Sequence, residues 1–424
     1  MRFIRQRHRL AAGIAAGLLT ITLAACGSEA TAAGTTGVAA SLATSAGAAA
    51  GPASGSAAGP GSGSAAGPGS ASAAGPGSGS AAGTEAGTGT AASTSTEAEA
   101  GTRKAAGGTV TLVTHDSFNM DKAVLAKFQQ QSGITLKILA QGDAGAMVNK
   151  LVLTKEKPLG DVVFGVDNSF ASRALDAGVL QPYASPAANS GAQKYSVDPE
   201  KRLTAVDYGD VCVNVDHAWF AAKKLAEPHT YEDLAAPQYK DLLVVPSAAT
   251  SSPGLAFLLG TIAHFGEQGW QQYWTALKNN GVKVTAGWED AYSVDFSGSS
   301  GKGARPLVLS YASSPPFEMA DGATEAPTGA LLDTCFRQVE YAGVLAGAAN
   351  PDGAKKVVDF MLSKDFQAAL PEQMYVYPVD TATKLPASWQ KYAPAASRPA
   401  TMDPATITAG REKWIGAWTD LVEG

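Results

Sequence analysis

Residues 109–166 read TVTLVTHDSFNMDKAVLAKFQQQSGITLKILAQGDAGAMVNKLVLTKEKPLGDVVFGV, and strand-like and helix-like patterns alternate along them. Runs of β-branched and aliphatic residues at 109–115, 135–140 and 161–166 predict three strands. Between these runs, apolar residues recur at helical spacing and predict two helices, the first of which ends at a typical C-cap glycine, Gly133. The order strand, helix, strand, helix, strand predicts a parallel sheet that is covered on both faces.

The same alternation returns later in the chain and predicts a second α/β unit. Strands are predicted at 242–245, 282–286 and 307–309, and helices at 253–265, 267–277, 355–362 and 411–422. Two such units predict two lobes with a cleft between them, and the apolar segments 211–215 and 335–341 are candidates for the strands that cross between the lobes. We place lobe 1 at 108–209 plus about 340–378, and lobe 2 at 210–339 plus about 379–424.

The N-terminal residues have the pattern of an export signal. Arginines at positions 2, 5, 7 and 9 precede an apolar run at 10–25, and Leu23-Ala24-Ala25-Cys26 resembles a bacterial lipobox. We predict a lipoprotein signal peptide at 1–25 and a lipidated Cys26, which would hold the exported chain on the extracytoplasmic side of the cell membrane. The alternatives are an ordinary signal peptide and an uncleaved anchor.

The next segment has too few apolar residues to fold. Residues 27–107 contain no Phe, Trp or Tyr, and many of them repeat Gly-Ser-Gly-Ser-Ala-Ala-Gly-Pro with small variations. Such a stretch cannot bury enough apolar surface to offset the entropy of ordering it. We therefore predict that 26–107 is a lipidated cysteine followed by a disordered linker, with an r.m.s. span of roughly 50 Å.

Charge and motif content exclude several classes of protein. Residues 108–424 contain 26 basic and 34 acidic residues, so their net charge is −8 with neutral histidines, and no nucleic-acid partner is expected. There is no HExxH motif, Walker lysine loop or nucleophile elbow between a strand and a helix, and we expect neither an enzyme nor a bound cofactor. The five histidines form no cluster with metal-ligand spacing, so no metal site is expected.

Two cysteines remain after Cys26. Cys212 and Cys335 both lie in apolar, strand-like segments. An even number of cysteines in an exported protein favours a disulfide between them. The alternative is two buried free thiols.

Several short segments together resemble one family. They are THDSF at 114–118, DVVFGVDN at 161–168, DYG at 207–209, SSPGL at 251–255, GWEDAY at 287–292, LSYASSP at 309–315 and MYVYPV at 374–379. In this combination and order, over about 310 residues, they resemble the thiamine-binding substrate-binding proteins of bacterial ABC importers. The resemblance implies an α/β, two-lobed type II periplasmic-binding-protein fold with hinge strands, preceded here by the disordered linker.

The resemblance also implies a function. The chain would be a monomeric solute-binding lipoprotein that captures thiamine, or a thiamine phosphate, and delivers it to the permease of an ABC importer. One alternative keeps the fold and changes the ligand to another small cation, a polyamine, a phosphonate or a ferric ion. A ferric site commonly uses adjacent tyrosines as hard oxygen ligands, and the sequence has no Tyr-Tyr pair. A further alternative is an exported enzyme, for which the sequence offers no catalytic constellation.

In the family, aromatic rings hold the rings of thiamine. The corresponding residues are Trp288, Tyr311 and Phe317, and Tyr292 lies in a matching segment, four residues after Trp288. Aromatic faces attract a thiazolium cation by about 0.5–2 kcal/mol each. The other interpretation of Trp288 and Tyr292 is that they pack together on one helical face. His115 and Phe317 stand where the relatives commonly have tyrosines, and His115 is a further candidate contact.

Two polar ligand contacts are expected from the same resemblance. Asp143 matches an acidic residue that could accept from the exocyclic amine of thiamine or neutralise its charge. Ser251 matches a residue near the hydroxyethyl or phosphate end of the ligand. Because Ser251 precedes a predicted helix, we expect the N-terminal N–H groups of this helix to receive that hydroxyl or phosphate.

Overall fold

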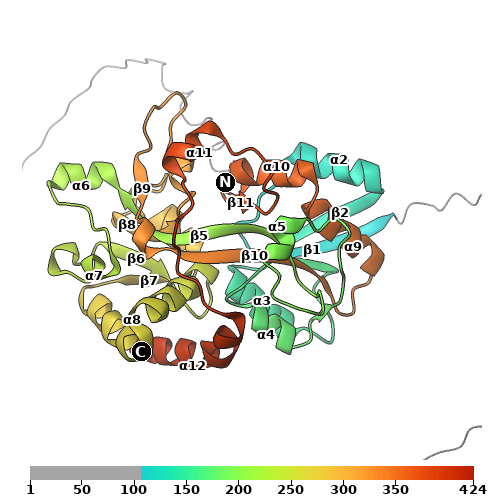
Figure 1. Ribbon diagram of the computed structural model, residues 1–424, viewed down its shortest axis with the longest axis horizontal. Helices are drawn as coiled ribbons and strands as arrows, with labels where there is room; N and C mark the ends of the chain where they lie inside the picture. Colours follow the sequence, from blue (N-terminus) through green and yellow to red (C-terminus); the bar gives the residue numbers. More distant parts are fainter. Residues whose placement is uncertain (1–106) are drawn as a thin grey trace, which may run out of the picture. The chain divides into compact units, whose positions relative to one another are not determined.

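The computed structural model describes residues 107–424 (Figure 1), and the predicted signal peptide, Cys26 and almost all of the predicted linker lie outside this range. One mixed sheet contains the eleven strands of these residues, which are β1 (Gly108–Thr114), β2 (Ile134–Ala140), β3 (Val162–Asp167), β4 (Leu180–Gln181), β5 (Thr204–Asp216), β6 (Leu243–Pro246), β7 (Lys283–Thr285), β8 (Leu307–Tyr311), β9 (Thr328–Ala330), β10 (Phe336–Leu345) and β11 (Tyr377–Pro378). Along the sheet the order is β2-β1-β3-β10-β5-β8-β6-β7, while β4 pairs with β10, and β9 and β11 pair with β5.

Helices connect the strands and cover the sheet. The α-helices are α2 (Lys122–Ser132), α3 (Ala144–Leu153), α4 (Ala171–Asp176), α5 (Ser190–Lys194), α6 (His217–Lys223), α7 (Tyr231–Leu234), α8 (Ser252–Asn279), α9 (Pro351–Met361), α10 (Lys364–Gln373), α11 (Ala387–Tyr392) and α12 (Pro404–Val422). Short turns of 3₁₀-helix form η1 (Pro237–Tyr239), η3 (Pro315–Glu318) and η4 (Leu332–Thr334), and η2 (Asp290–Asp295) is a turn of π-helix.

The N-terminal part of the sheet is the predicted βαβαβ unit. β1 pairs in parallel with both β2 and β3. α2 ends at Gly133, whose φ of 69° is the left-handed conformation that favours glycine at a C-cap. In β3, Val162 and Phe164 pack under α2, α9 and α10, whereas Val163 and Val166 pack against α3 and α4. Val162, Val163 and Phe164 thus alternate between the two faces, and the alternation is interrupted at Gly165, where the pairing with β10 is irregular. Both faces are buried.

The second parallel group consists of β6, β7 and β8. β6 pairs in parallel with its neighbours β7 and β8. The two helices predicted at 253–265 and 267–277 are both present within α8, and the break between them is at Gly266, which has a φ of 71° and a ψ of 172°. A glycine adopts this non-helical conformation at little cost, so the break was readable from the sequence.

Two long antiparallel strands connect the parallel groups. β10 pairs with β3 on one side and with β5 on the other, and β5 also pairs with β8. These strands contain most of the predicted crossing segments 211–215 and 335–341. Val211 is opposite Phe336, which places Cys212 opposite Cys335, and these cysteines form the predicted disulfide. The proposed lobe boundaries themselves stay a prediction.

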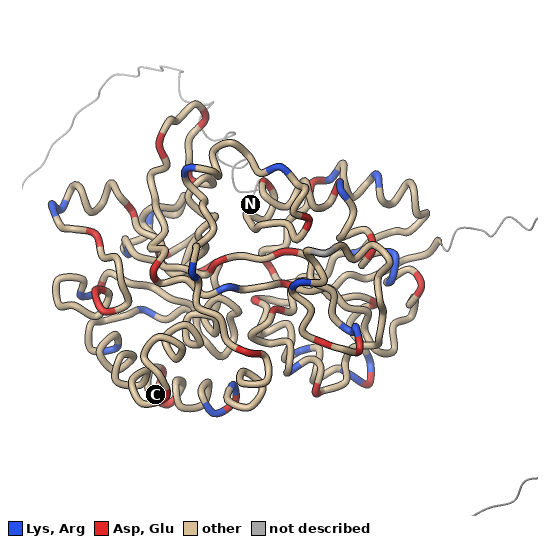
Figure 2. The backbone as a smooth tube through the Cα atoms, in the orientation of Figure 1, with Lys and Arg blue, Asp and Glu red and all other residues tan. Residues whose placement is uncertain are grey.

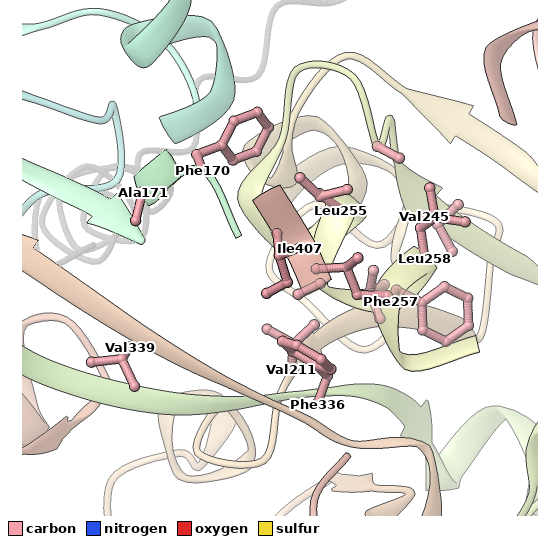
Figure 3. Packing of buried hydrophobic residues seen from close by; sticks show 14 of the residues in the cluster. Phe170, Ala171, Val211, Val245, Leu255, Phe257, Leu258, Phe336, Val339 and Ile407 are labelled. Carbon is pink, nitrogen blue, oxygen red and sulfur yellow. The ribbon is translucent and has the colours of Figure 1, made fainter. Parts of the chain in front are cut away.

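A large apolar cluster fills the space beneath the central strands. It contains residues of α8, α12, β5 and β10, part of which Figure 3 shows. The C-terminal helix α12 packs on α8 and also reaches α4, where its Arg411 guanidinium lies 5.8 Å from the ring centre of Phe170. α12 therefore contacts helices that belong to both parallel groups.

Charged residues of both signs are interspersed over the helices and loops (Figure 2). Among the helices of residues 107–424, none combines the length and apolar character that a bilayer crossing requires.

Candidate functional site

A cavity opens where the two parallel groups and β10 come together. Its empty volume is about 660 Å³, counted out to the open solvent at its mouth. The lining residues come from the loops after β1, β8 and α10, from the N-termini of α3 and α8, from η2 and η3, and from β10. They are His115, Asp116, Ser117, Asp143, Ala144, Ser252, Pro253, Trp288, Tyr292, Tyr311, Ser314, Phe317, Gln338, Glu340, Met374, Tyr375 and Val376.

Most of the predicted ligand-binding residues lie in this cavity although they are far apart in the sequence. Six of them line it, namely His115, Asp143, Trp288, Tyr292, Tyr311 and Phe317, whereas Ser251 does not. The sequence spread from 115 to 317 shows that the fold brings them together. Their contacts with a ligand stay a prediction.

Aromatic rings form one wall of the cavity. The rings of Trp288 and Tyr292 are stacked with centroids 4.9 Å apart, and the ring of Tyr311 meets Trp288 edge-on at 6.3 Å. The indole N–H of Trp288 donates to Ser310 Oγ at 3.1 Å, so the ring is held in a fixed orientation. Trp288 and Tyr292 therefore pack against each other on one helical turn, and both also line the cavity. Packing on one helical face and a position at the ligand site are thus compatible.

Asp143 joins the two parallel groups across the cavity. Its Oδ1 accepts from the backbone N–H of Ala144 at 2.7 Å and of Ser252 at 3.0 Å, and its Oδ2 accepts from the N–H of Trp288 at 2.9 Å. Burial raises the pKa of Asp143, while the N–H groups of Trp288 and Ser252 act in the opposite direction and limit the rise. Most of the hydrogen-bonding capacity of this carboxylate is already used by backbone groups.

Ser251 differs from its predicted role because it is the N-cap of α8. It is fully buried, and its Oγ accepts from the N–H of Gly254 at 3.4 Å. The other amides of the first turn are also engaged, because the N–H of Ser252 donates to Asp143, Pro253 has none, and that of Leu255 donates to the Ser251 carbonyl. The carboxylate of Asp143 thus occupies the place at this helix N-terminus where a phosphate was expected.

A second carboxylate lies behind Ser252. The Ser252 hydroxyl donates to Asp167 Oδ2 and accepts from the Gln338 side-chain amide at 2.7 Å. Burial raises the pKa of Asp167 to about 6, although hydrogen bonds from Ser252 and Ser169 oppose the rise. We call Asp143, Asp167, Ser252 and the backbone of Trp288 the seam, because these groups connect the first parallel group to the second.

A cluster of three titratable side chains forms the other polar side of the cavity. His115 Nε2 lies 3.3 Å from Glu340 Oε1, and Asp207 on β5 lies behind Glu340. Burial raises the pKa of Asp207 well above its usual range, and the charge of Glu340 raises it further. We call His115, Glu340 and Asp207 the floor.

Glu340 and Tyr375 are among the lining residues that the sequence did not single out. Glu340 is the one acidic residue of β10, which also contains the polar residues Arg337 and Gln338, and no local pattern marks it as a site residue. Tyr375 lies in a segment that was used for the family resemblance, and its φ of 57° is unusual for an aromatic residue. Its ring meets Phe317 at 4.9 Å, so this strained position completes the aromatic lining.

The charges of the lining suit a cation. Asp116, Asp143 and Glu340 line the cavity, and the lining residues found in the described part of the chain include no Lys or Arg. A group with a positive charge and flat rings would face both carboxylates and aromatic faces. Within residues 107–424, no three His, Cys, Asp or Glu side chains are placed to hold a metal ion together.

Comparisons with known proteins agree with this geometry. The model of the family described as "Bacterial extracellular solute-binding protein" matches residues 157–397. The thiamine-binding periplasmic protein of Escherichia coli (strain K12) is 30% identical over 326 residues, which are 74% of this chain and 93% of the relative. That of Brucella suis biovar 1 (strain 1330) is 28% identical over 74% of this chain and 92% of its own length.

The fold is also found among solved structures. A structure described as a periplasmic thiamin binding protein superposes with a TM-score of 0.64 at 27% identity, over 74% of this chain and 96% of that protein. The predicted two-lobed periplasmic-binding-protein fold is thereby confirmed.

Proposed function

The chain belongs to the bacterial extracellular solute-binding proteins, and we propose that it captures thiamine outside the cytoplasm and delivers it to an ABC importer, without catalysing a reaction. The observation that carries the proposal is the lining of the cavity, in which five aromatic rings face three carboxylates with no Lys or Arg among them. The names of the relatives support the same ligand.

The chemistry of thiamine matches this lining. The molecule has a thiazolium ring with a permanent positive charge and a flat aminopyrimidine ring. Trp288 and Tyr311 present faces and edges at nearly perpendicular angles, with an interplanar angle of 65°. Such a corner can contact both rings of a bent ligand, and each desolvated cation–π contact contributes about 0.5–2 kcal/mol.

Anionic ligands fit the cavity less well. A phosphate or phosphonate would meet Asp143 at the N-terminus of α8, where the first amides already have acceptors. We therefore expect thiamine to bind more tightly than its phosphates. Polyamines share the positive charge but lack flat rings, and within the described residues no three His, Cys, Asp or Glu side chains converge to hold a ferric ion.

The place of action is proposed from the N-terminus. Cys26 in its lipobox would carry the lipid, and the linker of residues 26–107 would let the binding unit move beside the permease as a monomer. Replacing Cys26 by Ser should release the chain from the membrane fraction without loss of ligand binding. Unchanged membrane retention of the Cys26→Ser chain would contradict the tether.

Isothermal titration of the purified full chain tests the ligand. We expect thiamine to bind, with thiamine monophosphate weaker and with spermidine and ferric citrate weaker still. Trp288→Ala should weaken thiamine binding by about 2 kcal/mol or more, as the loss of a buried aromatic anchor commonly does. The matched control is Trp219→Ala on α6, which removes an indole ring that does not line the cavity.

The outcomes separate the alternatives. A chain that ignores thiamine but binds spermidine or ferric ion would retain the family and overturn the ligand. Equal thiamine affinities of the wild type and Trp288→Ala would overturn the assignment of the cavity.

A further inference from the structure

We infer that Glu340 is the residue that recognises the positive charge of the ligand, and that His115 is its resident counter-ion, which releases a proton when the ligand binds. This inference rests on the proposed function, because it requires a cationic ligand.

The first step is to compare the three carboxylates of the cavity. Asp143 uses both of its oxygens to accept from three backbone N–H groups. Asp116 is exposed to solvent at the mouth, where the attraction of a cation is weak. Glu340 is only 7% exposed, and its partners in residues 107–424 are the side chains of His115 and Asp207 rather than backbone amides. It is therefore the buried carboxylate with capacity left for a ligand.

The second step concerns how His115 is held beside Glu340. The imidazole packs against the backbone of Gly165, where any side chain would collide with the ring, and its centroid lies 5.8 Å from that of Phe164. Gly165 has a φ of 98°, a left-handed conformation that suits glycine. This close approach keeps Nε2 at 3.3 Å from the Glu340 carboxylate.

The third step is the charge of the floor. Burial alone would lower the pKa of His115, but the charge and hydrogen bond of Glu340, with smaller contributions from Asp143 and Asp116, outweigh it and raise the pKa. Burial acts to raise the pKa of Glu340, yet the charge of His115 and hydrogen bonds from His115 and Asp207 lower it overall. These directions favour a charged pair of His115 and Glu340 beside a protonated Asp207.

The other groups that face His115 do not supply a positive charge. Asp143 and Asp116 lie nearby, and both add to the attraction for a proton. Burial raises the pKa of the Tyr311 hydroxyl well above its usual range, so this tyrosine stays neutral. None of these groups can therefore replace the positive charge of His115 beside Glu340, whereas a cation that enters the cavity can.

The consequence is a competition between ligand and proton. The bound cation interacts with Glu340, weakens the attraction that kept His115 charged, and so lowers the pKa of His115 in the complex. The imidazole then releases a proton to the solvent. By linkage, affinity for the cation rises with pH up to the pKa of His115 in the free protein, and it is weakened below that pH.

Titration calorimetry of the full chain with thiamine tests this directly. Experiments in two buffers of different ionisation enthalpy, between pH 6 and pH 8.5, give the number of protons released. We expect up to one proton and a rise in affinity of about 3- to 10-fold from pH 6 to pH 8. His115→Gln keeps a polar side chain without a titrating ring, and it should abolish both the release and most of the pH dependence.

Glu340→Gln keeps the shape and removes the charge. Its affinity for thiamine should fall by roughly 10- to 100-fold, the range expected for a hydrogen-bonded buried charge. Asp116→Asn is the comparison, because it removes an exposed carboxylate of the same cavity. Its affinity for thiamine should fall by no more than about 3-fold.

The outcomes distinguish a failure of the proposed function from a failure of this inference alone. If the wild type does not bind thiamine at any pH, the proposed function and this inference both fail. If it binds thiamine but releases no proton, or if His115→Gln releases as many protons as the wild type, the inference alone fails. It also fails if Glu340→Gln and Asp116→Asn lose affinity equally.

Discussion

The seam and the floor are two polar regions of one cavity, and they hold their carboxylates in opposite ways. At the seam, Asp143 accepts from three backbone N–H groups. At the floor, Glu340 is held by the side chains of His115 and Asp207. Backbone donors cannot change their charge, whereas His115 can lose a proton.

This difference separates two uses of a buried carboxylate. A carboxylate that is saturated by backbone amides fixes the position of the elements that carry those amides. A carboxylate that is balanced by titratable side chains can exchange one positive partner for another. The seam is therefore suited to holding the two parallel groups together, and the floor to recognising what lies between them.

The largest expected effect comes from removing the disulfide that joins the strand of Asp207 to the segment before the strand of Glu340. Cys212 is in β5, the strand of Asp207, and Cys335 directly precedes β10, the strand of Glu340. The disulfide closes a loop with a sequence separation of 123, so chain entropy predicts that Cys212→Ala with Cys335→Ala lowers the free energy of unfolding by roughly 4–5 kcal/mol. Chemical denaturation of the full chain, followed by tryptophan fluorescence, measures it.

Ligand binding should respond far less to this change. β5 and β10 remain paired through their backbone ladder, so the floor should keep its arrangement while the protein is folded. A reductant should lower the denaturation midpoint of the wild type to that of the double variant. The same reductant should leave the denaturation midpoint of the double variant unchanged. A thiamine affinity that falls in parallel with stability would mean that the disulfide positions the floor.

The second effect tests whether the seam holds the two parallel groups together. Asp143→Ser keeps an N-cap for α3 but is too short to reach the N–H groups of Ser252 and Trp288. Losing two hydrogen bonds to a charged acceptor should destabilise the contact between the two parallel groups by about 2–3 kcal/mol, and thiamine affinity should fall by roughly 30- to 150-fold. Calorimetry measures the affinity, and X-ray scattering measures whether the free chain becomes more open.

Asp143→Asn is the control for charge at the seam. One amide oxygen can still accept from two of the three donors, so its loss of affinity should be clearly smaller than that of Asp143→Ser. If the two variants lose the same amount of thiamine affinity, the charge of Asp143 determines binding, rather than its hydrogen bonds to the N–H groups of Ser252 and Trp288.

Sequence patterns located most of the seam but not its hydrogen bonds. Trp288 lies in one of the family segments, Asp143 matches an acidic residue of the family, and the helix that follows Ser251 is predicted from its apolar spacing. The role of Ser251 could not be predicted, because an N-cap hydroxyl turns back to its own helix and the next residue faces the cavity. Ser251 and Ser252 are adjacent in the chain, yet only Ser252 lines the cavity.

The floor was less visible in the sequence. His115 follows the first predicted strand and is a candidate contact. Asp207 lies in the family segment DYG at 207–209 without an assigned role, and Glu340 sits in a long central strand without a local signal. Their proximity depends on the pairing of β10 with β5, in which Glu340 is opposite Asp207. Pairing between strands that are more than a hundred residues apart is set by the whole sheet, so no local pattern could reveal it.

The smallest expected effect compares two glycines and tests how the floor is built. Gly165 has a φ of 98° and an added methyl group would collide with the His115 ring, whereas Gly178 has a φ of 68° and open space around it. An alanine at either position adopts a left-handed conformation, which should lower the free energy of unfolding by about 1–2 kcal/mol. Only Gly165→Ala should also displace His115 from Glu340.

The binding measurements should therefore separate two variants that have similar stability costs. With His115 displaced, Gly165→Ala should bind thiamine with a smaller difference between pH 6 and pH 8 than the wild type, because the proton of His115 no longer competes for Glu340. Gly178→Ala should keep the wild-type difference. If Gly165→Ala retains the full pH dependence, the contact with Gly165 does not hold His115 in place, and the competition at the floor must arise from another group, of which Asp143 is the nearest titratable neighbour on the seam.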